Sequence, residues 1–138
     1  SFALGLLINH FVPQSQLQAK GIVTDALSFL SQKRAELQAI GCTDIIIDPG
    51  FGFGKSLAEN HELLQKLEHL HLLGVPLLVG VSRKSMITKI LNCSASQALN
   101  GTSILHTLAY TKGARLFRVH DVAAAKEMIL LLEAQDLH

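Results

Sequence analysis

The sequence has little charge and almost no imbalance between positive and negative residues. Only 17% of its 138 residues are Asp, Glu, Lys or Arg, and the formal net charge is +1 with the histidines neutral. A protein that binds nucleic acid or an anionic membrane through its overall field carries a marked excess of positive charge. The composition therefore gives no reason to expect either partner, and any attraction for a negatively charged substrate must be local.

Cysteine is scarce, and long apolar runs are missing. The two cysteines, Cys42 and Cys93, are far apart and match no metal-binding or redox motif. We interpret them as reduced thiols, which favours a cytoplasmic protein. No apolar run approaches the ~20 residues that a membrane-spanning helix needs, and no secretory signal peptide is recognisable. We therefore expect no membrane partner.

Common signatures of nucleophilic and metal catalysis are also missing. The sequence contains no HExxH pair, no nucleophile elbow and no cysteine–histidine arrangement. His69 and His71 lie two apart on a predicted helix, so they face different directions and make a poor metal pair. We interpret these two as surface or packing residues, together with His61, His106 and His138.

The sequence does contain a regular alternation of short apolar runs and longer segments with helical spacing. Hydrophobic residues make up 49% of the chain, enough for the core of one domain. Ser56 and Glu59 form a candidate capping box, and Asp121 is placed to cap the last helix. The predicted strands are 3–8, 45–47, 77–81 and 116–119, and the predicted helices are 23–40, the upper fifties to 73, 84–112 with a break around 92–96, and 122–137.

This alternation predicts an α/β fold in which parallel strands are joined by right-handed helical crossovers. Two architectures fit it, a doubly wound open sheet and part of a (βα)8 barrel. In both, ligands bind at the carboxyl ends of the strands. Unusual polar residues gather at these places, in the segments Asn9–His10, Asp48–Lys55, Ser82–Ser85 and Arg118–Asp121.

The segment DPGFGFGK, residues 48–55, combines a carboxylate with glycines and phenylalanines. Burying Asp48 at the end of an isoleucine strand is costly unless something pairs with it. The glycines allow a flat ligand to approach the backbone, and the phenylalanines supply apolar walls. The alternative is a structural turn in which Asp48 pairs with a neighbour. A nucleotide P-loop is excluded, because its pattern needs glycine where Pro49 stands.

The two remaining strand ends carry cations. Ser82–Ser85 places two cations and two hydroxyls before a helix, which suits an anionic or strongly polar ligand. The alternative is a helix start with solvated basic residues. Arg118 and His120 point to the same side if the strand continues through them, and would then form an anion site or a stacking surface. These residues together predict a pocket for a flat heterocycle that carries phosphate, without a side-chain nucleophile.

Three segments of the chain resemble signatures of the dihydropteroate synthase family: 46–55, 77–85 and 118–122. Their order and spacing are similar to the C-terminal half of that enzyme. The resemblance implies a (βα)8 barrel of the TIM-barrel class, to which residues 1–138 supply about four βα units, strands five to eight, with no separate second domain. It also implies a transferase of folate biosynthesis and target of sulfonamides, which joins 6-hydroxymethyl-7,8-dihydropterin pyrophosphate to p-aminobenzoate, giving 7,8-dihydropteroate and pyrophosphate.

The resemblance implies roles for the residues in the matching segments. Asp48 would hydrogen-bond the amino and N3 side of the pterin, and Lys84 would meet its carbonyl and N5 edge. Arg118 would stack on the pterin and, with His120, hold the pyrophosphate. Asp48, Lys84 and Arg118 would be the catalytic residues, and we expect Asp48→Ala and Lys84→Ala to abolish the condensation.

The p-aminobenzoate site is implied by the same segments. Phe53 would wall it, Gly52 would contribute to substrate binding, and Ser85 would receive the carboxylate. The reaction would proceed by loss of pyrophosphate, leaving a ring-stabilised cation that the arylamine captures. The site would act by positioning and electrostatic stabilisation.

The family resemblance also implies Mg²⁺, with its ligand in an N-terminal half, so we expect no metal ligand in this chain. We expect further βα units upstream and a homodimer, since half a barrel leaves sheet edges and apolar surface exposed. The first ~40 residues diverge from the family pattern, and in 8–14 only His10 is comparable. Alternative functions are a pterin-dependent methyltransferase, an inactive pterin-binding fragment and a sugar-phosphate barrel.

Overall fold

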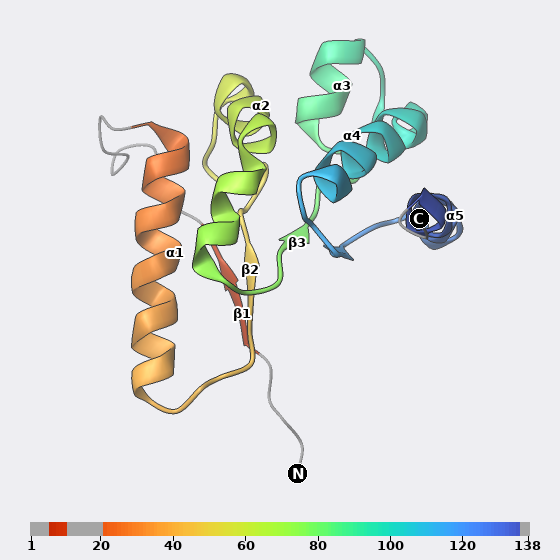
Figure 1. Cartoon of the computed structure of the whole chain (residues 1–138). Coiled ribbons are helices and arrows are strands. Elements are labelled where there is room, and N and C mark those ends of the chain that lie inside the picture. Colours follow the sequence, from red (N-terminus) through yellow and green to blue (C-terminus); the bar gives the residue numbers. More distant parts are fainter. Residues whose placement is uncertain (1–5, 11–20, 136–138) are drawn as a thin grey trace.

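The computed structural model describes residues 6–10 and 21–135 (Figure 1). Its four strands are β1 (Leu6–Asn9), β2 (Ile45–Asp48), β3 (Leu78–Val79) and β4 (Leu116–Phe117). Its helices are α1 (Ile22–Ala39), α2 (Leu57–Gln65), α3 (Ser85–Leu91), α4 (Leu99–Thr111) and α5 (Val122–Gln135), with 3-10 helices η2 (Leu67–Leu73) and η3 (Ala95–Gln97). The predicted alternation of strands and helices is therefore confirmed in the described residues. The predicted strand residues 3–5 and helix residues 136–137 lie outside them, as does His138.

The strands are parallel and follow one another in sequence order. β1 pairs with β2 from Leu6↔Ile45 to Asn9↔Asp48, and β3 pairs with β4. A bridge between Ile47 and Leu77 connects β2 to β3. A doubly wound sheet reverses its strand order at a switch point, whereas a barrel keeps sequence neighbours adjacent. The order β1-β2-β3-β4 therefore decides for part of a (βα)8 barrel.

The core lies between the strands and the helices. Figure 1 shows the helices arranged from α1 to α5 around one side of the strands. Ile45, Ile47 and Val79 belong to the buried cluster that includes leucines of α1, α2 and η2. On the other face of β1, Leu7 is 47% exposed. In a parallel sheet side chains alternate between faces, so this more open face is the one that turns toward the barrel interior.

Local signals set several helix ends where they were predicted, but the helix predicted to end at residue 73 is α2 to Gln65 followed by the 3-10 helix η2. The Ser56–Glu59 capping box is present, since Ser56 Oγ accepts the Glu59 N–H at 3.1 Å and Glu59 Oε2 accepts the Ser56 N–H at 2.7 Å. Asn92, with φ 50°, ends α3 inside the predicted break. β3 and β4 are shorter than predicted, and the chain turns soon after β3, where Lys84 N–H donates to Val81 O at 3.1 Å. Among the described residues, no helix is both long enough and apolar enough to cross a membrane.

His106 supports the end of β3 from α4, as a packing residue. Its side chain is 1% exposed, its Nε2 accepts the Val81 N–H at 3.4 Å, and its ring packs edge-on against Phe117. Burial lowers the pKa of His106 to about 4, and the charge of Lys84 adds to the shift. The neutral imidazole is therefore the form that the fold accepts.

Acid should weaken the fold through His106. An unfolded histidine titrates near pH 6.5, so between pH 6.5 and about 4 the unfolded chain binds a proton that the folded chain does not. Stability is fully present above this window, and we expect roughly 3 kcal/mol to be lost across it. Urea unfolding at the two ends of this pH window should show a smaller loss of unfolding free energy in His106→Gln than in the unmodified protein. The exposed His69→Gln should lose as much as the unmodified protein. Equal losses in all three would contradict the assignment.

Candidate active site

The candidate site is centred on Asp48, the last residue of β2. Its side chain is buried, with 0% exposure, and both carboxylate oxygens have partners. Oδ1 accepts the N–H of Gly50 at 2.8 Å, and Oδ2 accepts a hydrogen bond from Arg118 Nη2 at 3.0 Å. The contact with Arg118 joins two predicted site segments that are 70 residues apart in sequence. Asp48 is thus both part of a turn and part of a shared site.

Gly80 makes room for Arg118, a role that our reading of the sequence missed. A Cβ at Gly80 would lie 2.9 Å from Arg118 Nη2 and 3.2 Å from its Nε. A side chain at residue 80 would therefore displace the guanidinium that reaches Asp48. A glycine inside a predicted strand marks a close approach of this kind, and that was the available signal.

Lys84 brings the loop after β2 against the turn after β3. Its Nζ donates to Phe51 O at 2.6 Å and lies 5.0 Å from the centre of the Phe53 ring. A Cβ at Gly52 would contact Lys84 Cδ at 3.4 Å, so the loop backbone passes close to the lysine. Burial lowers the pKa of Lys84, the charge of Arg118 lowers it further, and Asp48 opposes both. The predicted grouping of these residues is therefore found in the structure.

Lys55 holds the shape of the loop instead of facing a ligand. Its Nζ donates to the carbonyls of His10, Gly50 and Phe53 at 3.0, 2.8 and 3.3 Å. Burial lowers the pKa of Lys55 to about 8, against the opposing charges of Asp48 and Glu59. These contacts give the last residue of DPGFGFGK, which is half-buried, a structural role.

Two further contacts fix the same loop. Asn60, 2% exposed, accepts the N–H of Gly52 at 2.8 Å through Oδ1. Gly50 has φ 76°, and a Cβ there would lie 2.1 Å from His10 O, so only glycine fits. Our reading of the sequence assigned no role to Asn60. An asparagine in a predicted helix near a glycine-rich loop was the only local signal.

His10 lies beneath the loop and not at its surface. Its ring is buried, its Nε2 is 2.9 Å from Asp25 Oδ2, and it packs edge-on against Phe29. Burial lowers its pKa, mainly by disfavouring the charged form. The other residues of the divergent segment, 11–14, lie outside the described residues.

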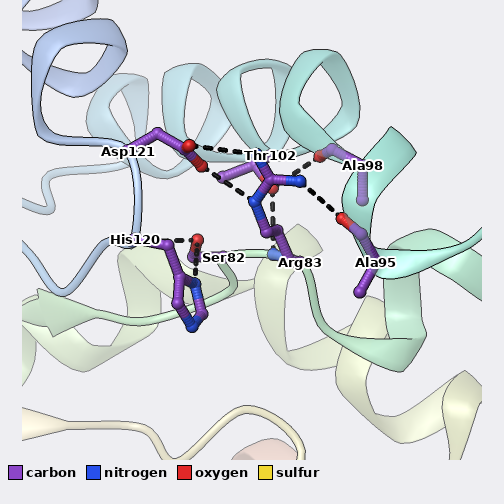
Figure 2. Close-up of polar contacts among 7 residues, drawn as sticks. All are labelled: Ser82, Arg83, Ala95, Ala98, Thr102, His120 and Asp121. Atoms are coloured by element: carbon purple, nitrogen blue, oxygen red, sulfur yellow. Dashed lines mark hydrogen bonds and ion pairs between the residues drawn. The ribbon is translucent and has the colours of Figure 1, made fainter.

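The turn after β3 contacts the segment after β4 through two neighbouring pairs (Figure 2). Ser82 Oγ lies 2.7 Å from His120 Nδ1 and accepts the His120 N–H at 3.3 Å. Arg83 donates from Nε and Nη2 to the two carboxylate oxygens of Asp121, each at 2.9 Å. The two segments are therefore joined side chain to side chain.

These contacts correct two expectations. Arg83 has φ 55°, which directs its side chain to Asp121 and Ala95 and not to an anionic ligand with Lys84. The Asp121 carboxylate binds Arg83, so the contacts seen do not make it the side-chain cap of α5. The hydrogen bonds from Arg83 lower the pKa of Asp121. The Asp121 side chain therefore pairs with a residue 38 positions away in sequence instead of capping the helix that follows it.

Arg118 and His120 take different partners, Asp48 and Ser82. β4 ends at Phe117, so the alternation of side chains along a strand does not extend to them. Both side chains are exposed, as is Ser85 in the first turn of α3. The site therefore presents a guanidinium, an imidazole and a hydroxyl on its open side and a buried carboxylate beneath.

The described residues do not fit a magnesium site. No group of three or more His, Cys, Asp and Glu among them could hold a metal ion. Both oxygens of Asp48 are already occupied by Gly50 and Arg118. No step of the chemistry below is therefore assigned to a metal bound by these residues.

Comparison with known proteins shows the family of this chain. The sequence profile of the pterin binding enzyme family matches residues 1–120. The chain belongs to this family. Among pterin binding enzymes, the dihydropteroate synthase of Haemophilus influenzae is 39% identical over 139 residues, covering 96% of this chain and 50% of that protein. The Escherichia coli K12 dihydropteroate synthase is 44% identical over 101 residues, covering 73% of this chain and 36% of that protein.

Solved structures of pterin binding enzymes have the same fold. A Yersinia pestis dihydropteroate synthase with a sulfonamide drug complex superposes with a TM-score of 0.90 at 35% identity, over 97% of this chain and 52% of that one. A Xanthomonas albilineans dihydropteroate synthase with 4-aminobenzoic acid also gives 0.90, at 34% identity, over 99% and 50%. The chain spans about half the length of these relatives and aligns with their C-terminal part. The prediction of a barrel half is confirmed.

Proposed function

We propose that this chain forms the substrate-binding half of a dihydropteroate synthase. The observation that carries the proposal is the joining of Asp48, Arg118, Lys84 and Phe53 at the carboxyl ends of three neighbouring strands. A buried carboxylate beside a partly buried ammonium and an aromatic ring suits a flat heterocycle with donors on one edge and acceptors on the other. The names of the relatives support the same activity.

In the proposed complex, the pterin displaces Arg118 from Asp48. The amino group and N3–H of the pterin donate to the Asp48 carboxylate, and Lys84 donates to the carbonyl and N5 edge. Arg118 is 47% exposed, so it can move to stack on the ring and bind pyrophosphate oxygens together with His120. The exchange keeps the buried carboxylate paired throughout, which avoids the penalty of an isolated buried charge.

The proposed chemistry needs positioning and no covalent intermediate with the protein. The C–O bond to pyrophosphate breaks with its electron pair leaving on oxygen, and the exocyclic methylene becomes a cation stabilised by the dihydropterin ring. The amine of p-aminobenzoate, held by Phe53, Gly52 and Ser85, attacks this carbon and then loses a proton. Arg118 and His120 stabilise the departing charge, so the site lowers the barrier by orientation and electrostatics.

A condensation assay on the full polypeptide that carries this chain tests the proposal. It contains dihydropterin pyrophosphate, labelled p-aminobenzoate and Mg²⁺, and labelled dihydropteroate is the expected product. We place the magnesium ligands outside this chain, so chelation should stop turnover without changing the chain's own stability. Pterin binding without product would favour a binding protein, and methyl transfer from a methylated folate to a corrinoid would favour a methyltransferase.

We also propose a cytoplasmic homodimer. Cys42 and Cys93 are free, as in a reducing compartment. Ile104 of α4 and Leu130 and Leu131 of α5 are 58%, 65% and 69% exposed, and exposed apolar side chains of this size are typical of surfaces that a second subunit covers. Light scattering should give twice the polypeptide mass, and Leu131→Glu should halve it. Leu72→Glu, at another exposed leucine, should leave the mass unchanged, and a monomer in the unmodified protein would refute the dimer.

A further inference from the structure

Two pairs of side chains lie side by side between the turn after β3 and the segment after β4: Ser82 with His120, and Arg83 with Asp121 (Figure 2). Because the paired residues are adjacent in sequence on both segments, the contacts form a ladder with two rungs. A bidentate arginine–carboxylate pair fixes orientation as well as distance. The Arg83–Asp121 rung therefore constrains how the Ser82–His120 rung can be arranged.

The Arg83 rung is anchored to α4 and held in an uncommon backbone conformation. The Arg83 N–H donates to Thr102 Oγ1 at 2.9 Å, and Thr102 Oγ1 donates to Ala98 O at 2.7 Å. Arg83 lies at φ 55°, a region that glycine adopts freely and other residues enter at a cost. Glycine would relieve this cost but has no side chain, whereas the Arg83 guanidinium makes the two hydrogen bonds to Asp121. Strain of this type is typical of functional sites whose surroundings hold the backbone in place.

The Ser82 rung places a hydroxyl against one ring nitrogen of His120. Ser82 is 6% exposed, and its Oγ accepts the backbone N–H of His120. The same Oγ lies 2.7 Å from Nδ1, a contact in which the hydroxyl donates when Nδ1 carries no proton. With the hydroxyl as donor, the neutral imidazole carries its ring proton on Nε2. Figure 2 shows the ring pointing away from Arg83 and Asp121, so the Nε2–H is directed away from the ladder.

We propose that Ser82, Arg83 and Asp121 are positioning residues that orient His120 and hold its Nε2–H as a donor for an anion. That the anion is the pyrophosphate of the pterin substrate rests on the proposed function. The ladder acts through His120 and touches no substrate itself. The turn after β3 thus contributes to two parts of the site. The Arg83 side chain extends to Asp121 in the ladder, and the neighbouring Lys84 side chain extends to Phe51 O in the loop after β2.

The test uses Ser82→Ala, Arg83→Gly and Asp121→Asn in the full polypeptide. Arg83→Gly relieves the backbone strain while removing the rung, so it separates positioning from folding. Glu36→Gln is the matched control, since it removes a carboxylate from an exposed pair with Lys33. The measurements are the ¹⁵N signals of the His120 ring, assigned with His120→Gln, and the dissociation constants of inorganic pyrophosphate and of a hydroxymethylpterin without pyrophosphate.

We expect a single Nε2–H tautomer in the unmodified protein and a mixture in the three ladder variants. Pyrophosphate should bind up to about tenfold more weakly in each variant, because molecules with the other tautomer or a misoriented ring lack one hydrogen bond to a charged group, while pterin affinity and the control stay unchanged. An unaltered His120 spectrum in Arg83→Gly and Ser82→Ala would overturn the proposal. So would an equal loss of both ligands with a lower melting temperature. If the unmodified protein bound no pyrophosphate but its tautomer still depended on Ser82, the ladder would stand and the proposed function would fail.

Discussion

Replacing Lys84 with alanine is expected to lower the turnover number of the proposed condensation by about 10²- to 10³-fold, the usual effect of removing one preorganised donor from a site. Lys84 Nζ lies 2.6 Å from Phe51 O and 5.0 Å from the centre of the Phe53 ring, between the two proposed substrate positions. Its partial burial makes each interaction with a substrate stronger than it would be in water. Steady-state kinetics with both substrates would measure the effect.

Lys89→Ala is the matched control for this prediction. Lys89 is an exposed lysine on the same helix, α3, and its substitution should leave turnover unchanged. Circular dichroism and melting temperature should be similar in both variants, because Lys84 contributes one side-chain hydrogen bond and caps no helix through its side chain. Near-normal turnover in Lys84→Ala would remove this residue from the proposed site.

Asp48→Asn is expected to weaken the binding of a dihydropterin by about 100-fold, since one of the two hydrogen bonds to the carboxylate is lost and the other no longer has a charged acceptor. Asparagine can still accept the Gly50 N–H, so the turn after β2 keeps its contact. The amide then meets Arg118 without a negative charge, and the pterin loses the oxygen that pairs with its second donor. Calorimetric titration of the full polypeptide would give the dissociation constant.

The control for Asp48→Asn is Asp44→Asn, which changes an exposed carboxylate just before the same strand. Pterin affinity should not respond to it. Asp48→Ala would be a poorer test, because it removes the acceptor of the Gly50 N–H and leaves a buried donor unsatisfied. Pterin binding within twofold of normal in a folded Asp48→Asn variant would show that this carboxylate does not bind the ring.

The sequence alone was sufficient for the elements of the fold and for the strand-end segments that the structure brings together. Apolar spacing, β-branched runs and the Ser56–Glu59 capping box are properties of neighbouring residues, and they define elements without tertiary contacts. The positions of Asp48 and Lys84 followed from the rule that parallel α/β folds bind ligands at strand ends. The spacing of the elements could not decide between an open sheet and a barrel, because the pairing of β2 with β3 depends on contacts between distant residues, and only the family resemblance implied the barrel.

Only the tertiary structure decided the partners of the charged side chains. Arg83 and Asp121 are 38 residues apart and were assigned separately, one to a ligand and one to a helix end, yet they bind each other. The roles of Gly80 and Lys55 likewise depend on tertiary contacts. Gly80 leaves room for the Arg118 guanidinium, and Lys55 Nζ donates to the carbonyl of Gly50. Secondary structure is specified by local periodicity, whereas ion pairs and close approaches depend on which segments the fold brings together, and that information is spread over the whole chain.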